Sequence, residues 1–287
     1  KKNDKPRTRI LAYPKPLNHI SFIYAMKMKT PFDAFGNIAL VKFKDKTGVK
    51  GKRLFANKLL RDNKSVRTVL EKIRGFTGRL RKQKTRWIVG EKTKEAVYRE
   101  NDCVFRFNMD SVYFSPRLSN ERKEIAQKIK KGNEVLVMFG GVAPYPIVIA
   151  RNSKAHRVYS VEISKEASKY AKLNAELNNV KNKVYVIQGD VKRVALKLKK
   201  EGENFDVIVM PRPQLKDSFL EEAFMLSKKN TTVFYYDFCK EDEIKDVVDK
   251  IGFEAKKYKK RIKVLKVKKA GEIAPYKYRI RVDFKVL

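Results

Sequence analysis

The stretch EVLVMFGGVAP, residues 134–144, decides the fold of this chain. Its first five residues are typical of a buried strand, and the glycines Gly140 and Gly141 end that strand ahead of a helix. Just upstream lies DSVYFSPRLSNER, residues 110–122, which predicts a short strand, a Ser-Pro-Arg turn and the start of a charged helix. A strand that ends on glycines before a helix is typical of a nucleotide-type cofactor site, to which the upstream segment would deliver reactive groups.

Strands and helices alternate from residue 135 onward. Such alternation produces right-handed crossovers and a mostly parallel sheet with helices on both faces. Two consecutive long strands, about 253–267 and 276–286, predict an antiparallel hairpin at the sheet edge. The predicted class is α/β, with the Rossmann-like sheet of class I S-adenosylmethionine-dependent methyltransferases rather than that of a dehydrogenase. The other predicted strands cover residues 135–138, 157–162, 183–188, 206–210 and 232–237, and the predicted helices 146–152, 164–178, 191–199, 216–226 and 241–251.

Apolar runs between residues 20 and 108 are shorter and irregularly spaced, and several alternate with polar residues. This pattern favours strands, with one helix around residues 52–61. The runs cover residues 20–25, 38–43, 66–73, 85–89, 95–98 and 103–107. We therefore expect a small α+β domain over residues 1–110, which would bind RNA, and the methyltransferase-like domain over residues 111–287.

The small domain also contains the densest basic cluster of the chain, residues 74–87. Its glycines let the backbone approach a phosphate, its cations would neutralise that phosphate, and Phe76 and Trp87 could stack on a base. The alternative is a solvated loop with Trp87 in the core. For Trp87 itself the sequence favours the core.

The charge of the whole chain points to a polyanionic partner. The sequence has 68 Lys and Arg residues against 32 Asp and Glu, a formal net charge of +36, and the excess is spread along the chain. RNA or DNA is the leading partner for such a distribution. A Lys-rich coding bias that only solvates the surface is the alternative, because Lys forms helices well and is rarely buried.

Cysteine and histidine are too few and too scattered for a structural metal site or a disulfide framework. Cys103 and Cys239 have no CxxC spacing, and His19 and His156 complete the set of soft ligands, so we predict no bound metal. The longest apolar runs fall short of a membrane span, and the basic start lacks a following hydrophobic segment, which favours a cytoplasmic protein. The chain opens on Lys1 rather than Met, so we expect residues upstream of it.

Four predicted strand ends carry residues suited to a cofactor. Small residues at Gly140-Gly141 let a ligand approach the main chain, although paired glycines also form ordinary turns. Glu162 follows some twenty residues later, as expected for a carboxylate on ribose hydroxyls, or else it compensates a helix dipole. Asp190 would accept from an adenine amino group, or would only cap a helix. Pro211 begins a stiff turn that would wall the pocket. Their coincidence at successive strand ends favours the cofactor interpretation.

The segment Val112-Tyr113-Phe114-Ser115-Pro116-Arg117-Leu118, with Glu121-Arg122 and the later Met138-Phe139-x-Gly141-Val142-x-Pro144-Tyr145, resembles the archaeal and eukaryotic tRNA (guanine-N1)-methyltransferases that act on position 37. Gly78-Arg79-Leu80-Arg81 is similar to that family's Gly-x-x-Arg segment, and Ala274-Pro275-Tyr276 to its Ala-Pro pair. The likeness runs from about residue 30 to the end. It implies a monomer that acts on the tRNA anticodon loop, and many members have a separate N-terminal domain.

The resemblance also implies a mechanism. Guanine N1 bears a proton and is a poor nucleophile, so a base must remove that proton as the methyl group is transferred. Glu121 matches the base, and Arg81 matches an arginine that hydrogen-bonds guanine O6. Without the resemblance, Glu121 would be an ordinary first-turn acid of a helix. The implied RNA contacts are Arg79, Arg81 and Arg117. The implied S-adenosylmethionine contacts are Tyr113, Arg122, Phe139, Gly141, Val142, Glu162, Ile163, Asp190, Val191 and Pro211.

Three positions depart from the family pattern. Val137 stands where many members have an acidic residue, Ala143 replaces a glycine, and Pro211 replaces an asparagine. The first two changes would weaken cofactor binding. A proline at position 211 resembles the pattern of an archaeal subgroup that also methylates the tricyclic guanine derivative of the wyosine pathway at C7. A less polar pocket wall would suit such a tricyclic base.

Three functions follow as alternatives. The first is methylation of guanosine 37 in tRNA, with possible extension to the tricyclic base. The second is transfer of the aminocarboxypropyl group of the same cofactor, as in a neighbouring wyosine-pathway enzyme. The third is a non-catalytic RNA-binding protein on a methyltransferase fold, which Val137 and Ala143 would permit.

Overall fold

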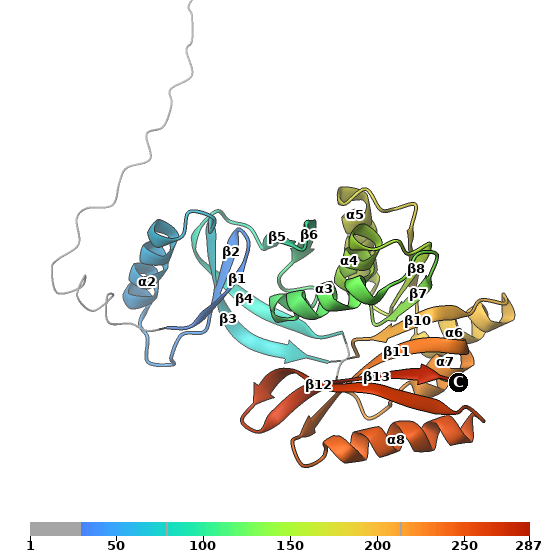
Figure 1. Ribbon diagram of the computed structural model, residues 1–287. Helices are drawn as coiled ribbons and strands as arrows, with labels where there is room; N and C mark the ends of the chain where they lie inside the picture. Colours follow the sequence, from blue (N-terminus) through green and yellow to red (C-terminus); the bar gives the residue numbers. More distant parts are fainter. Residues whose placement is uncertain (1–29, 79, 213) are drawn as a thin grey trace, which may run out of the picture.

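The computed structural model describes residues 30–78, 80–212 and 214–287, and Figure 1 shows a small sheet beside a larger one. The larger sheet has seven strands in the order β12-β13-β11-β10-β7-β8-β9. The predicted α/β class and the antiparallel hairpin at its edge are confirmed. The parallel strands are β7 (Glu134–Met138), β8 (Arg157–Glu162), β9 (Val184–Gln188), β10 (Phe205–Met210) and β11 (Ser227–Lys240), and the edge hairpin is β12 (Ile262–Ala274) with β13 (Lys277–Val286).

Helices cover both faces of this sheet and bury successive residues of its inner strands in different cores. Val135 and Val137 of β7 belong to one core, and Leu136 and Met138 to the other. Burial on both faces explains why these strands are continuously apolar. Figure 1 shows α4 and α5 on one side of the sheet and α8 on the other. The first core includes α3 (Ser119–Lys128), α4 (Pro144–Asn152) and α5 (Lys165–Leu177), and the second α6 (Val191–Lys200), α7 (Leu220–Met225) and α8 (Ile244–Lys257).

Two predicted boundaries near the end of the chain are wrong. The helix expected over residues 216–226 begins only at Leu220. The strand expected from residue 253 begins at Ile262, because α8 continues to Lys257. Val247, Ile251 and Ala255 are buried at helical spacing, whereas Phe253 is exposed, so the helical period wins over the short alternation that suggested a strand.

The small sheet has the order β1-β2-β3-β4, and its central pair is parallel. The parallel pair is joined by α2, whose Phe55 and Leu59 pack on Ala39 and Val41 of β2. The alternate residue Leu40 turns to the other face and joins the first core of the large sheet. The elements are β1 (Phe32–Phe35), β2 (Ile38–Val41), α2 (Val49–Asp62), β3 (Thr68–Thr77) and β4 (Lys82–Gly90).

Trp87 on β4 corrects one expectation. Its side chain is 40% exposed, and its ring N–H donates to the carbonyl of Glu91 at 3.2 Å. The following residues Ile88 and Val89 pack against the α2 core instead. A register shift lies between the pairs Val69↔Val89 and Leu70↔Trp87, which separates the tryptophan from this core. The apolar run at residues 20–25 lies outside the described residues.

A two-stranded hairpin, β5 (Glu95–Glu100) with β6 (Cys103–Asn108), connects the small sheet to the large one. Asn174 on α5 and Asn178, the residue that caps the end of this helix, bind the backbone of β6 as a neighbouring strand would. The amide of Asn174 accepts from Arg106 N–H at 2.8 Å and donates to Arg106 C=O and to Val142 C=O at 3.1 Å. Asn178 pairs with Val104 in the same way. The hairpin therefore packs on the larger part, and the division at residue 110 stays a prediction.

None of the helices in the described part of the chain combines the length and apolar character that crossing a membrane requires. Within those same residues, His, Cys, Asp and Glu side chains do not gather into a group that would hold a metal ion. Cys103 and Cys239 are both buried and free.

We predict that Asn174→Ala lowers the free energy of unfolding by about 2 to 4 kcal/mol, because it leaves the N–H and C=O of Arg106 and the C=O of Val142 without their partner. Urea unfolding measures the change. Lys169→Ala on the exposed face of α5 removes a surface ion pair and should cost about 1 kcal/mol or less. Equal losses of unfolding free energy in the two variants would contradict the stabilising role of the Asn174 hydrogen bonds.

Candidate functional site

Two cavities adjoin at the carboxyl ends of the parallel strands, and Ile163 lines both. The inner cavity, of about 100 Å³, lies at the ends of β7, β8 and β10. The outer cavity, of about 600 Å³, lies between the loop after β8 and the start of α6. The inner cavity is lined by Leu80, Arg81, Val112, Tyr113, Phe139, Gly141, Glu162, Ile163, Ser164, Ala167 and Pro211. The outer cavity is lined by Ile163, Gln188, Gly189, Asp190, Arg193, Val194 and Lys197.

The turn after β7 brings main chain to the inner cavity. A Cβ on Gly140 would lie 2.1 Å from Ser160 Oγ, so a larger residue fits beside β8 only if the Ser160 side chain shifts. Gly141 and Phe139 have left-handed backbone, with φ of 59° and 60°. Ala143 also has φ of 65°, a conformation that a glycine adopts without a steric penalty. This explains why glycine suits position 143 and shows that alanine is accommodated there.

Glu162, at the end of β8, is the acidic side chain of the inner cavity. Its two carboxylate oxygens accept from the N–H groups of Gly141 and Ser164, each at 2.8 Å. Burial raises the pKa of Glu162 above its usual value, and these backbone donors oppose the rise without cancelling it. Ile163 N–H is a third backbone donor to this carboxylate, so of its roughly four lone-pair sites about one is left to accept from a hydroxyl group in the cavity.

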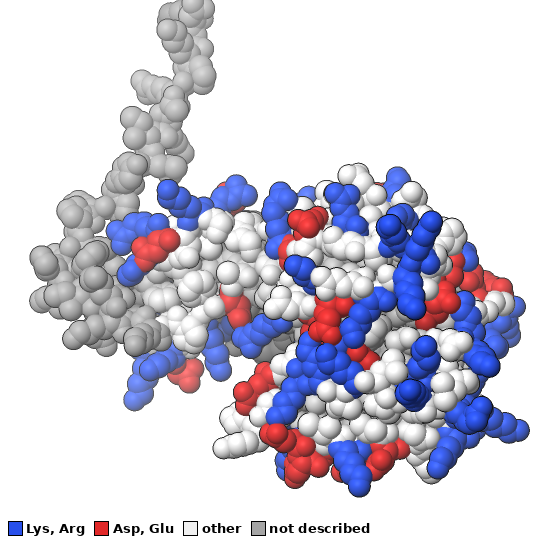
Figure 2. Space-filling model, in the orientation of Figure 1, with Lys and Arg blue, Asp and Glu red and all other residues white. Residues whose placement is uncertain are grey.

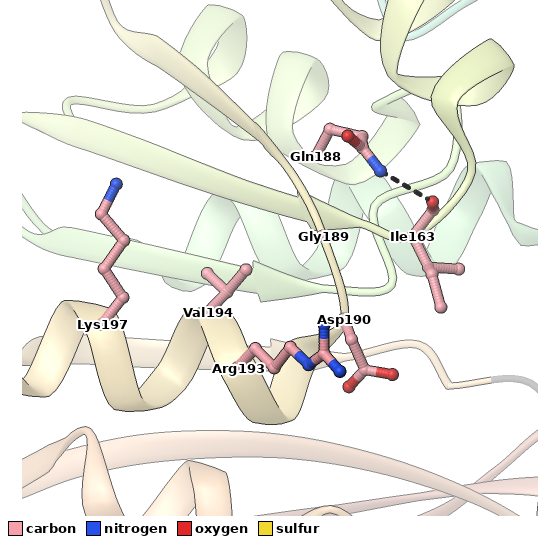
Figure 3. A pocket seen from close by; sticks show the side chains of 7 residues that line it. All are labelled: Ile163, Gln188, Gly189, Asp190, Arg193, Val194 and Lys197. Atoms are coloured by element: carbon pink, nitrogen blue, oxygen red, sulfur yellow. Dashed lines mark hydrogen bonds between the residues drawn. The ribbon is translucent and has the colours of Figure 1, made fainter.

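Figure 3 shows the residues of the outer cavity, which shares Ile163 with the inner one. The side-chain amide of Gln188 donates to the carbonyl of Ile163 at 3.2 Å and fixes the floor between the cavities. Asp190 caps α6 by accepting from Lys192 N–H at 2.9 Å, as one of the two sequence interpretations expected. It also lines the cavity, so the capping does not remove it from the site. Val191 begins α6, is buried, and lines neither cavity.

Arg81 and Tyr113 separate the inner cavity from a wider groove. The Arg81 guanidinium carbon lies 3.8 Å from the centre of the Tyr113 ring, and Phe76 meets that ring edge-on at 4.8 Å. Arg81 has a φ of 50° in the turn between β3 and β4. Both residues line both spaces, so this stacked pair connects the end of the large sheet with the small sheet.

The groove has a volume of about 390 Å³ and is bounded by three segments: the small sheet, residues 113–118, and the tip of the β12–β13 hairpin. Lys72, Arg81, Arg117 and Arg279 give it a positive lining, and Phe76 and Tyr113 supply rings. Arg117 is largely exposed and pairs with Asp33 at 3.1 Å. Cations beside aromatic rings are the groups that bind single-stranded nucleic acid.

Glu121 is buried on α3 and lines neither the inner cavity nor the groove. One carboxylate oxygen accepts from Tyr236 OH at 2.9 Å and from Arg281 at 2.6 Å, and the other lies 2.5 Å from Lys268 Nζ. Arg281 also binds Glu124 and Asp283, and Lys128 binds Asp283 at 3.2 Å. We call these seven residues the ion cluster. A hydrogen bond from Arg281 lowers the pKa of Glu124 to about 2.

Three other predicted contacts lie apart from the cavities or outside the described residues. Arg122 is fully buried, forms a two-pronged ion pair with Glu100 and donates to Ser115 C=O at 3.0 Å. Val142 is buried under the Asn174 amide. Arg79 lies outside the described residues. Arg122 thus fixes the turn that carries Tyr113 and Arg117 rather than facing the cavities, and its cofactor contact stays a prediction.

The turn after β10 is held from behind by a buried arginine. Arg212 donates to the carbonyls of Leu215 and Asp217, each at 3.0 Å, and to Asp237 at 2.5 Å. Tyr235 OH donates to the second oxygen of Asp237 at 2.8 Å. These bonds leave Pro211 against the inner cavity.

Several lining residues were missed by sequence reasoning. Lys72 and Arg279 in the groove lie on strands far apart in the chain, and their positions carry no motif. Arg279 hydrogen-bonds Tyr113 and follows the Ala-Pro-Tyr segment closely, which is the one signal that would have pointed to it. Arg193 and Lys197 project from α6 into the outer cavity at a spacing of one helical turn.

Residues 96–265 match the TRM5/TYW2 methyltransferase domain. The chain is 31% identical over 299 aligned positions to the tRNA (guanine(37)-N(1))/4-demethylwyosine(37)-methyltransferase Taw22 of Nanoarchaeum equitans, an alignment that covers 88% of this chain and 98% of that protein. It is also 31% identical to the tRNA (guanine(37)-N(1))-methyltransferase Trm5b of Pyrococcus abyssi, over 90% of this chain and 76% of that protein. The crystal structure of that Trm5b superposes with a TM-score of 0.79 at 29% identity, covering 98% of this chain and 82% of the other.

We predict that Tyr113 ionises below the ordinary tyrosine pKa of 10.0. Burial alone would raise the pKa, but the charges of Arg81 and Arg279 and the hydrogen bonds from Ser115 and Arg279 outweigh it. Ultraviolet titration of the protein and of Tyr113→Phe gives the difference. Tyr159→Phe is the control, because burial and the bond to Glu203 raise the pKa of Tyr159 to about 12. A Tyr113 phenolate that forms only above pH 10 would refute the prediction, and Arg81→Met should raise this pKa.

Proposed function

Because the chain belongs to the TRM5/TYW2 methyltransferase family, we propose that it transfers a methyl group from S-adenosylmethionine to N1 of guanosine 37 in tRNA. The observation that carries this proposal is the shared boundary at Arg81 and Tyr113. On one side lies the inner cavity with Glu162 and the glycine turn, and on the other the positively lined groove. Donor and acceptor sites therefore meet at one stacked pair of side chains.

The residues of the two cavities suit S-adenosylmethionine. Gly141 lines the inner cavity without a side chain, so the main chain of the turn is open toward it. Glu162 is held by the backbone donors of Gly141, Ile163 and Ser164 and keeps acceptor capacity for a ribose hydroxyl. Ile163 and Asp190 in the outer cavity would take the adenine. Tyr113, Phe139 and Pro211 would surround the methionine part of the cofactor. Val142, Val191 and Arg122 lie behind the residues that line the cavities and would support them.

The chain's own residues would prepare the base. When bound, S-adenosylmethionine supplies an electrophilic methyl group on a sulfonium and leaves as a neutral thioether. Arg81 would donate to guanine O6, where negative charge develops as N1 loses its proton. Glu121 would accept that proton. To do so, its carboxylate must turn from the ion cluster toward the groove, since it lines neither cavity in the structure.

The anticodon loop of tRNA is the partner that the groove suits. The chain carries a net charge of +36, and Figure 2 shows Lys and Arg over much of the visible face, with acidic residues in smaller groups. We propose that Arg81 and Arg117, with Lys72 and Arg279, bind the loop backbone, and that residues 30–110 form an RNA-binding part. Arg79 belongs to the same proposal by resemblance alone. A monomer in the cytoplasm agrees with it and stays a prediction.

A second substrate is supported by Pro211. The relative Taw22 is named for both guanosine and 4-demethylwyosine methylation. In this chain the wall of the inner cavity has a proline ring, which offers neither a side-chain amide nor a backbone donor. We propose that the protein also methylates C7 of the tricyclic base, because an apolar wall accepts a larger, less polar base.

Mass analysis of the nucleoside at position 37 tests the function. Purified protein is incubated with S-adenosylmethionine and either unmodified tRNA or tRNA carrying 4-demethylwyosine. One added methyl group on each supports both proposals, and methyl on guanosine alone removes the second. An added aminocarboxypropyl group would assign the neighbouring wyosine-pathway activity. No transfer, together with no calorimetric binding of S-adenosylmethionine, would favour a non-catalytic RNA-binding protein.

We predict that Glu121→Gln lowers the single-turnover rate about a hundredfold or more and leaves tRNA affinity within about twofold, as loss of a general base does. The matched control Glu166→Gln removes the same charge from an exposed position on α5 and should keep the normal rate. Thermal unfolding checks that both variants fold. A normal rate for Glu121→Gln would assign the residue to the ion cluster alone.

A further inference from the structure

Glu121 is held away from the groove by partners of unequal mobility. Arg281 is completely buried and divides its donors among three carboxylates, so it is fixed in the ion cluster. Lys268 is different: its side chain is 31% exposed and reaches Glu121 and Glu124 from β12, with Nζ at 2.5 Å from each carboxylate. Of the two cations on Glu121, only Lys268 has a route to solvent.

The strand that carries Lys268 also borders the groove. Residues 270–273 at the tip of β12 line it, and the first of them is two residues from Lys268. β12 is the edge strand of the sheet, and its pairing with β13 shifts register between Lys269 and Gly271. An edge strand with an interrupted ladder deforms more easily than a central one. A ligand in the groove would therefore contact the strand segment that begins two residues after Lys268.

We propose that Lys268 is a positioning residue that holds Glu121 in the ion cluster until RNA fills the groove. The entering RNA brings phosphate oxygens, which are competing acceptors for the ammonium, and it contacts the tip of β12. Withdrawal of Lys268 leaves one oxygen of Glu121 free to turn toward the base. The inference rests on the proposed function, because it concerns the residue assigned as its base.

The proton balance of the step is simple. The N1–H bond of guanine breaks as the N1–CH₃ bond forms, the S–CH₃ electrons return to sulfur, and the proton ends on Glu121. A carboxylate with two cations on it is a weak proton acceptor, and one with Arg281 alone is a stronger acceptor. Withdrawal of Lys268 on RNA binding would leave Glu121 with one of its two cationic partners before the proton is taken.

Charged and titratable groups face Glu121 from every neighbouring element. Glu124 lies on the same helix, Tyr236 on β11 and Lys268 on β12, while Arg281 and Asp283 lie on β13. Tyr145 on α4 donates to Tyr236. Burial raises the pKa of Tyr236 well above its ordinary value, so it remains a donor. Burial opposes protonation of Lys268, but the bonds to Glu121 and Glu124 prevail and raise its pKa.

The test is the pH dependence of single-turnover methylation of guanosine 37 by the full chain and by Lys268→Met. The rate divided by the half-saturating concentration reports the free protein, and the rate at saturation reports the RNA complex. The acid limb is the pH range over which the rate falls as the pH is lowered. For the rate divided by the half-saturating concentration, we expect this limb to move about 1 to 2 units to higher pH in Lys268→Met, because a neighbouring cation is lost. The acid limb at saturation should not move, because Lys268 has already left.

Other outcomes overturn the inference. If both acid limbs move together, Lys268 stays on Glu121 throughout, and if neither moves while RNA affinity falls, it is only an RNA contact. Lys268→Arg should restore the normal limb, and Lys263→Met, an exposed lysine of the same strand, should leave it unchanged. If Lys268→Met does not fold, Lys268→Gln replaces it, and loss of fold in both would make the role structural.

Wild-type protein and Glu121→Gln in the same assay separate the two levels of the argument. No methyl transfer by wild-type protein refutes the proposed function and this inference with it. A normal wild-type rate, a slow Glu121→Gln and an unshifted Lys268→Met refute the role of Lys268 alone.

Discussion

The buried guanidinium of Arg281 is the interaction on which the geometry of the site depends. It has no exposed surface and binds Glu121 at 2.6 Å, Glu124 at 2.6 Å and Asp283 at 2.7 Å. A charged side chain is stable in the protein interior only when it has such partners. Loss of one member of this group leaves buried charges without a partner. Burial by itself would lower the pKa of Arg281, but these carboxylates raise it, so the charge is permanent. Helix α3 is thereby locked to β13, and the segment before α3, which carries Tyr113 and Arg117, is locked with it.

A second constraint sets the small sheet against the large one. The side chains of Asn174 and Asn178 hydrogen-bond the backbone of β6. In addition, Leu40 of the small sheet shares a hydrophobic core with Val137 of the large sheet. The Asn174 amide also binds the carbonyl of Val142 in the glycine turn. One side chain therefore joins the glycine turn of the large sheet to β6 of the hairpin. Arg81, in the turn between β3 and β4, stacks on Tyr113, which follows β6.

The parts of the fold that follow from local periodicity were predictable from sequence. Strands β7, β8 and β10 are buried on both faces, and their apolar runs indicate buried strands. The inner cavity was equally accessible, since strand order brings Gly141, Glu162 and Pro211 to one edge. The end of α8 was missed because residues 253–257 fit both a strand and a helix, and packing of Ala255 decides. The ion cluster was also missed, because Glu121, Lys268 and Arg281 are far apart in the chain and meet only through sheet pairing.

In the turn after β10, one residue fixes the position of the inner-cavity wall and its neighbour forms the surface of that wall. Its shape depends on Arg212, which is buried and bound to Leu215 C=O, Asp217 C=O and Asp237. Pro211 faces the inner cavity but is not among the groups that make these bonds. Arg212 thus sets the position of this wall and Pro211 sets its polarity, and the two residues have different partners. The residue that lines the cavity at position 211 is therefore not the residue that holds the turn, because the bonds to Leu215, Asp217 and Asp237 all come from Arg212.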